Sequence, residues 1–219
     1  QIYFAQNDYS KALDYFKKSL KLDLSFFGEN HPSVASGYYN IGYVYFAQGD
    51  YSKALEYFEE VLKIRLSVYG ENHSRVASVY NDIGEIYSVQ GDDFKALDYF
   101  KKSLKIVLSV YGENHSQVSS IYDHIGEIYF AQKDYSKALY YFEESLKIRL
   151  SLFGENHPEV ALSYYSIGSL YIIQGDKSKA LNYYEKSLKI RLSVYGENHP
   201  LTKEIMDLIN VANSKVLQS

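Results

Sequence analysis

The feature that most constrains the fold of this chain is a period of 42 residues that recurs without insertion. The string Gly-Glu-Asn-His begins at Gly28, Gly70, Gly112, Gly154 and Gly196, so each spacing is 42. A Lys-Ala-Leu triplet keeps the same register. A fixed period of this size is typical of arrays in which each repeat packs against its neighbours. We therefore expect one array over 1–219, with a partial repeat at 1–28, full repeats at 29–70, 71–112, 113–154 and 155–196, and a terminal helix at 197–219.

Each repeat is predicted to hold two helices. Tyr38, Ile41 and Tyr45 are spaced by three or four residues, which places them on one face of a first helix. A second series with helical spacing runs from Ala54 to Leu66, after a short polar turn. The Gly-Glu-Asn segment is expected to end the second helix, because glycine accepts the left-handed conformation of a helix C-terminus. At 1.5 Å per residue, the helices would be roughly 21 and 25 Å long, for about 14 and 17 residues.

Small and aromatic residues recur where the two helices must pack. Gly42 and Ala54 lack bulk at the expected point of closest approach, and Tyr38, Tyr45 and Tyr57 supply large apolar surface around them. A single pair of helices cannot bury both of its faces, so neighbouring pairs must stack. The predicted fold is therefore all-α, a right-handed α-solenoid superhelix of ten or so antiparallel helices with no strand.

The repeated residues resemble a known family. Ile41-Gly42, Tyr45 and Gly49, followed by Ala54, Phe58 and Leu62, are similar to the signature of the tetratricopeptide repeat (TPR). The 42-residue period, the His-Pro before the first helix and the Lys-Ile-Arg near the end of the second resemble the kinesin-light-chain type of TPR. The resemblance covers essentially the whole chain. It implies a helical scaffold that holds a peptide segment on a concave surface built from the first helices.

Kinesin-light-chain repeats commonly carry an Asn-Asn pair on that surface, where the amides hold the backbone of the ligand. The matching pairs in this chain are Tyr39-Asn40, Asn81-Asp82, Asp123-His124 and Tyr165-Ser166. Only Asn40 and Asn81 keep an amide side chain. The resemblance therefore implies the scaffold, while the departure argues against a kinesin light chain as such.

The residues that differ between repeats are the candidates for ligand contact, since stacking fixes the others. Three positions vary on the first helix of each repeat, and they lie on one side of it. The predicted ligand groove therefore consists of Tyr39, Asn40, Tyr43, Asn81, Asp82, Glu85, Asp123, His124, Glu127, Tyr165, Ser166 and Ser169. Aligned across repeats, these residues form a strip with aromatic ends and an acidic middle.

Two interpretations of this strip remain open. In the functional one, the carboxylates of Asp82, Glu85, Asp123 and Glu127 attract lysine or arginine of a partner, with only His124 to offset their charge. The tyrosines at the ends would contact aliphatic or cationic side chains. In the alternative, the strip is a solvated polar face that varies because nothing constrains it.

Composition excludes several other classes of function. The net charge of −4 gives no general affinity for nucleic acid, and neither a basic amphipathic segment nor a long apolar run indicates membrane binding. Cysteine is absent, which removes thiolate metal sites and fits a reducing, cytoplasmic location. No catalytic motif, metal-ligand spacing or phosphate-binding loop is present. We therefore expect no enzyme, no cofactor and no metal site. The histidines of the recurring tetrapeptide are expected to cap helices.

The predicted function is a protein–protein interaction scaffold that binds a peptide segment, possibly basic, in the groove. The alternative is a structural array that associates with itself, because repeats this similar could stack end to end between chains. A third possibility is a consensus-engineered chain without a dedicated partner, although differences such as Pro32 against Ser74 favour a natural sequence.

Overall fold

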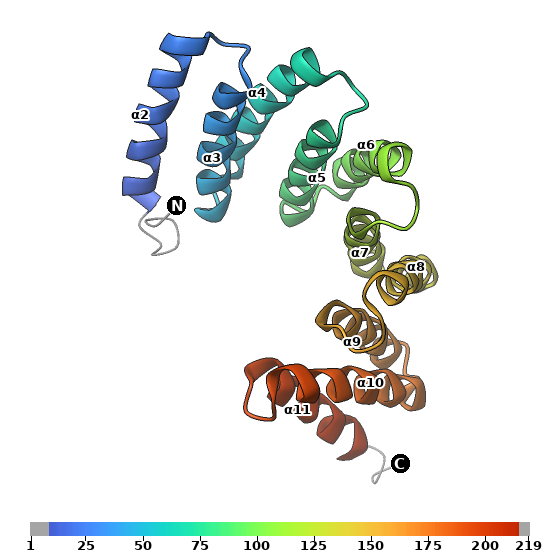
Figure 1. Cartoon of the computed structure of the whole chain (residues 1–219). Helices are drawn as coiled ribbons and strands as arrows, with labels where there is room; N and C mark the ends of the chain where they lie inside the picture. Colours follow the sequence, from blue (N-terminus) through green and yellow to red (C-terminus); the bar gives the residue numbers. More distant parts are fainter. Residues whose placement is uncertain (1–8, 215–219) are drawn as a thin grey trace. The chain divides into compact units, whose positions relative to one another are not determined.

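The computed structural model describes residues 9–214, and the fold of this part is all-α. Ten helices follow one another in it without a strand (Figure 1). They are α2 (Tyr9–Phe27), α3 (Pro32–Ala47), α4 (Tyr51–Tyr69), α5 (Ser74–Val89), α6 (Asp93–Tyr111), α7 (Ser116–Ala131), α8 (Tyr135–Phe153), α9 (Pro158–Ile173), α10 (Lys177–Tyr195) and α11 (Pro200–Ser214). The prediction of an all-α array of helix pairs is confirmed. Residues 1–8 of the partial repeat and 215–219 of the terminal helix lie outside the described residues.

The first helix of a full repeat has 16 residues and the second has 19, two more than the sequence suggested for each. The difference lies at the ends. The first helix begins with the proline or serine that follows the histidine, and the second continues to the residue before the glycine. Gly70, Gly154 and Gly196 cap second helices with φ of 78°, 75° and 79°, as predicted for a glycine C-cap.

The recurring histidine caps the first helix of each repeat. The Nδ1 atom of His31 accepts a hydrogen bond of 3.1 Å from the backbone N–H of Ser33. The His31 ring also stacks on Phe27 from the preceding helix, with ring centroids 4.4 Å apart. The same two contacts recur at the other four histidines, His73, His115, His157 and His199. The predicted capping role is confirmed.

The chain divides into two compact units, Gln1–Val110 and Tyr111–Ser219. In the first unit, α3 packs against α2 and α4, and α4 packs against α5. In the second unit, α8 packs against α7 and α9, and α10 packs against α9 and α11. Within each unit, neighbours in sequence are therefore neighbours in space, as an array of helix pairs requires. The single continuous array over both units stays a prediction.

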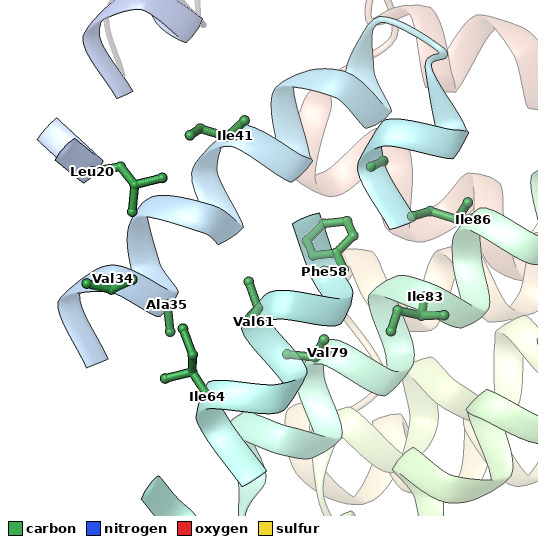
Figure 2. Close-up of a cluster of buried hydrophobic side chains, with 11 residues drawn as sticks. Leu20, Val34, Ala35, Ile41, Phe58, Val61, Ile64, Val79, Ile83 and Ile86 are labelled. Carbon is green, nitrogen blue, oxygen red and sulfur yellow. The ribbon is translucent and has the colours of Figure 1, made fainter. Parts of the chain in front are cut away.

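The core of the first unit consists of apolar side chains from α2 to α5 (Figure 2). Ile41 of α3 and Phe58 and Val61 of α4 are at most 1% exposed. Val79 and Ile83 of α5 join the same cluster, so each repeat is completed by the first helix of the next. The second unit repeats this arrangement around Phe142, Ile167 and Leu170.

Glycine in the first helix allows the second helix to approach closely. A Cβ atom added at Gly84 would lie 2.8 Å from Cε1 of Phe100, and one added at Gly126 would lie 2.7 Å from the same atom of Phe142. These distances are shorter than side chains tolerate, so the rings occupy the space that a larger residue would need. The predicted role of the small residues is confirmed.

The tyrosines that stack between the two helices of a repeat are structural, as predicted. Tyr45 of α3 and Tyr57 of α4 stack with ring centroids 5.5 Å apart, and both rings are half buried. The equivalent pair in the next repeat, Tyr87 and Tyr99, stacks at 5.6 Å. Among the described helices, we find none that is long and apolar enough to cross a membrane.

Candidate functional site

The residues of the predicted groove lie on α3, α5, α7 and α9, the first helices of the four full repeats. Half of them belong to each unit, so the continuity of the strip across the units stays a prediction. Asn40, Tyr43 and Glu127 are exposed, whereas the other nine side chains are half buried. The face is therefore less free of packing than its variation suggested.

The first variable position of a repeat faces an arginine from the second helix of the same repeat. The guanidinium of Arg65 lies over the ring of Tyr39, 5.3 Å from its centroid. Arg191 lies over Tyr165 in the same way at 5.0 Å. In the third repeat this position is Asp123, whose carboxylate forms an ion pair of 2.6 Å with Arg149. The sequence-based view that only His124 offsets the acidic strip is therefore wrong, because the helix behind the strip supplies arginines.

In the second repeat, both the first variable position and the arginine position differ from the other repeats. It carries Val107, which is buried, at the position of the arginine, and Asn81 at the position that faces it in the other repeats. An aspartate there would lack a cation, and a buried carboxylate without a partner is costly. Part of the variation that suggested a ligand site is therefore explained by pairing within the repeat.

Asp82 and Glu85 form a partly buried acidic pair in the first unit. Burial, and the charge of Glu85 beside it, raise the pKa of Asp82 to about 7. A hydrogen bond with Tyr39 and the charge of Arg65 oppose this rise. Burial also raises the pKa of Glu85, against a hydrogen bond of 2.7 Å that its Oε1 accepts from Asn81. One carboxylate oxygen of Asp82 and the side-chain oxygen of Asn81 are buried without a hydrogen-bond partner. This part of the strip can therefore accept further donors.

In the second unit, Asp123 is already paired with a cation. The carboxylate of Asp123 shares Arg149 with Glu159, which lies 3.1 Å from the same guanidinium nitrogen. His124 lies 4.0 Å from Glu127, and burial lowers the pKa of His124 below its ordinary value. His124 is therefore neutral near pH 7. Of the carboxylates predicted for this unit, Glu127 extends furthest into solvent.

Glu127 stands at the rim of a pocket that brings four predicted groove residues together. The pocket has a volume of about 220 Å³. It is lined by Glu127 and Phe130 of α7, Phe142 of α8, and Tyr165, Ser166 and Ser169 of α9. Its floor is aromatic, because Phe142 is almost fully buried and Phe130 half buried. The predicted residues Glu127, Tyr165, Ser166 and Ser169 supply the wall and the polar groups.

In the first repeat, an aromatic side chain of the chain itself occupies the place equivalent to this pocket. Tyr43 stands at the position of Glu127, and its ring contacts Phe46 and Tyr39 at centroid distances of 6.2 and 6.4 Å. In the fourth repeat this position is Ser169, which accepts a 3.2 Å hydrogen bond from the hydroxyl of Tyr184. Tyr184 replaces the phenylalanine of the other repeats, so Ser169 satisfies a hydroxyl that only this repeat buries.

Sequence reasoning missed two groups of residues at this site. The first group is the arginines Arg65, Arg149 and Arg191, which recur with the period. The second repeat has Val107 in place of the arginine and Asn81 at the position that faces it, and a comparison of the repeats could have revealed this link. Phe130 and Phe142 recur as well, but periodicity alone does not distinguish a ring that floors a pocket from one that fills a core. In the described part of the chain, no group of three or more histidine, aspartate or glutamate side chains could hold a metal ion.

Comparison with known proteins places the chain among kinesin-light-chain-like repeat structures. The crystal structure of BtubC (BKLC) from P. vanneervenii is similar with a TM-score of 0.79 and 25% identity, over 90% of this chain and 78% of that one. A putative kinesin light chain from Podosopora anserina with nearly identical TPR-like repeats is similar with a TM-score of 0.73 and 16% identity, over 88% and 92% of the two chains. The apo form of RapI is similar with a TM-score of 0.72 and 20% identity, over 87% and 66%. No curated protein matches the chain.

The tetratricopeptide repeat model matches four overlapping segments, at residues 1–67, 33–109, 75–151 and 117–193. These segments span most of the chain and follow its 42-residue register. Proteins of this kind generally mediate protein–protein interactions and are typically non-catalytic. The chain belongs to the tetratricopeptide repeat family.

Proposed function

We propose that this chain is an interaction scaffold that binds a segment of a partner protein along the first helices of its repeats. The pocket lined by Glu127, Phe130, Phe142, Tyr165, Ser166 and Ser169 is the observation that carries the proposal. Its residues come from three successive helices, and four of them belong to the strip that varies between repeats. A pocket of about 220 Å³ is smaller than the ~300–1,000 Å³ of typical small-molecule sites, and it suits one large side chain.

The chemistry of the pocket favours lysine or arginine as that side chain. The aromatic rings of Phe130 and Phe142 offer an apolar surface to the aliphatic stem, which such side chains bury readily. The carboxylate of Glu127 stands at the rim, where it can pair with the charged head. Tyr165 adds aromatic surface to the pocket wall, while Arg191 of the chain itself lies over its ring.

The first unit offers a pH-dependent contact of its own for a basic side chain. Asp82 and Asn81 each present a buried oxygen without a partner, and both accept donors. Because the pKa of Asp82 is about 7, this carboxyl is largely protonated below neutral pH and must release its proton to pair with a cation. Binding of a basic segment should therefore strengthen as pH rises from 6 to 8.

A peptide array probed with the whole chain and two single variants tests this function. Glu127→Gln removes the charge at the pocket while keeping its size. Glu143→Gln makes the same change on an exposed position of α8 outside the pocket, and serves as the control. We expect basic peptides to bind the wild type and the control alike and the pocket variant several-fold more weakly. Equal binding of acidic and basic peptides, or equal losses in both variants, would refute the proposal.

The alternative, end-to-end self-association, has weaker support. Helix α11 is a first helix in the repeat register, but it carries the exposed Asn210 where the other first helices carry glycine. In those repeats a Cβ atom would come within 2.7 to 3.1 Å of the second helix. Asn210 therefore obstructs a second helix from another chain in that register. Sedimentation over a range of concentrations tests this directly: we expect a constant mass, and a rising mass would favour self-association.

A further inference from the structure

A second pocket lies on another face of the third repeat and shares no residue with the groove pocket. It has a volume of about 330 Å³ and lies between the loop before α7 and the helices α7 and α8. Its lining consists of Glu113, Asn114, Tyr122, Tyr140, Glu144, Lys147, Ile148 and Ser151. A 3.0 Å hydrogen bond from Asn114 to Ser151 ties the loop to α8. The pocket thus combines two tyrosine rings with two carboxylates.

The equivalent place in two other repeats is filled by a lysine of the chain itself. In the second repeat, the ammonium of Lys102 lies 6.0 Å from the ring centroid of Tyr80 and 4.7 Å from that of Tyr99. In the fourth repeat, the ammonium of Lys186 lies 5.5 Å from Tyr164 and 5.3 Å from Tyr183. Lysine over tyrosine is a favourable cation–π arrangement. This place on the repeat therefore accommodates an ammonium group.

The third repeat keeps the tyrosine but lacks the lysine. Tyr122 stands at the position of Tyr80 and Tyr164, and Glu144 replaces Lys102 and Lys186. Among the described residues, no lysine or arginine lies over the ring of Tyr122. Burial raises the pKa of Tyr122, and the nearby Tyr140, Glu144 and Glu113 raise it further. The ring and both carboxylates therefore lie close enough together to act on one bound group.

Tyr140 gives the pocket a wall that the other full repeats lack. Its position is Glu56, Asp98 and Asn182 elsewhere, and its ring is 57% exposed beside the pocket. Lys147 lies at the rim, 3.6 Å from Glu144, with 76% of its side chain exposed. An ion pair this exposed contributes little, so an entering cation can replace it at small cost.

We infer that this pocket binds the ammonium group of a lysine side chain from a partner protein, in the place that Lys102 and Lys186 fill in their own repeats. The two tyrosine rings enclose the stem and face the cation, and Glu113 and Glu144 supply the opposite charge. The site is separate from the groove pocket, so the scaffold can contact basic residues on two faces of the third repeat.

The test uses N-acetyl-lysine methylamide as the probe and the norleucine analogue, which lacks the charge, as its matched control. The tyrosine ring signals of the whole chain are followed by NMR during titration. We expect saturable shifts at Tyr122 and Tyr140 with the lysine probe and not with norleucine. Equal shifts with both probes, or no shift at either ring, would overturn the inference.

Two variants test whether the lysine probe binds in this pocket. Glu144→Lys gives the third repeat the lysine that the second and fourth carry, so it fills the pocket with the chain's own ammonium and should fold normally. We expect the variant to bind the lysine probe about tenfold more weakly or not at all, as loss of a cation–π contact and of an ion pair implies. Glu60→Lys makes the same change at the equivalent position of the first repeat and should leave the shifts of Tyr122 unchanged. Unchanged binding in Glu144→Lys, with its melting temperature retained, or equal loss in both variants, would overturn the inference. Groove binding, measured with the peptide array, is unaffected by either result.

Discussion

Replacing Arg149 by valine would give the third repeat the residue that the second repeat carries as Val107. The Arg149 side chain is only 5% exposed, and its guanidinium pairs with Asp123 at 2.6 Å and with Glu159 at 3.1 Å. It also donates a 2.8 Å hydrogen bond to Ser163. Asp123 is 19% exposed, so valine would leave its carboxylate partly buried without a cation.

Breaking a buried ion pair by removing one partner typically costs about 3–5 kcal/mol. For Arg149→Val we expect a loss at the lower end of this range, about 3 kcal/mol of unfolding free energy at pH 7. The reason is that Asp123 is partly exposed and Glu159 can turn to solvent. Burial already raises the pKa of Asp123, and loss of Arg149 would raise it further. The destabilisation should therefore shrink at pH 5, where the carboxyl is more readily protonated.

The second repeat also indicates the compensating change, since it pairs Val107 with Asn81. Asp123→Asn in the Arg149→Val background should recover about 1–3 kcal/mol, because a neutral amide needs no cation. The assay is urea denaturation followed by circular dichroism for the wild type, both single variants and the double variant. Strictly additive effects would refute the conclusion that variation at position 123 is linked to the arginine behind it.

Three further predictions concern single residues of the first unit. Because burial raises the pKa of Asp82 from 3.8 to about 7, the folded state holds a proton that the unfolded state has released, and stability falls as pH rises from 4 to 7. In urea melts, Asp82→Asn should therefore be more stable than the wild type at pH 8 and equally stable near pH 4. The difference at pH 8 is at most about 4 kcal/mol, because each of the three pKa units corresponds to about 1.36 kcal/mol. Gly84→Leu places side-chain atoms where Phe100 lies and should cost at least ~1–3 kcal/mol, measured in the same way. Glu59→Ala, on an exposed position of α4, should change stability by less than about 0.5 kcal/mol, and a larger effect than that of Gly84→Leu would contradict the assigned faces.

The helices and their sequential pairing could be predicted from the sequence, because the same small and large residues recur in every repeat. Glycine at Gly84 and the ring of Phe100 recur together, so the point of closest approach is visible as a pattern of small and large residues. The helix ends were predictable for the same reason, since histidine and glycine recur at the caps. Their exact lengths were not, because capping residues extend a helix beyond its last apolar position.

The candidate site could be predicted only in part. The strip of variable residues contains four that line one pocket, Glu127, Tyr165, Ser166 and Ser169. Variation alone could not separate residues free to contact a ligand from residues that match a partner inside the repeat. Asp123 belongs to the second kind, because its charge is matched to Arg149. That distinction depends on which side chains of two neighbouring helices contact each other, and the spacing of residues along one helix does not show this.

Because the chain has no cysteine, peptide binding in the groove pocket can be tested at a single introduced thiol. Ser166→Cys introduces a single thiol inside the groove pocket, and Ser193→Cys introduces one on an exposed position of α10 outside it. The measurement is the rate at which a thiol reagent modifies each variant, with and without a saturating amount of the tightest basic peptide from the array. We expect the peptide to slow modification at position 166 and to leave the rate at position 193 unchanged. Peptide binding that leaves the rate at position 166 unchanged would show that the groove pocket is not the binding site.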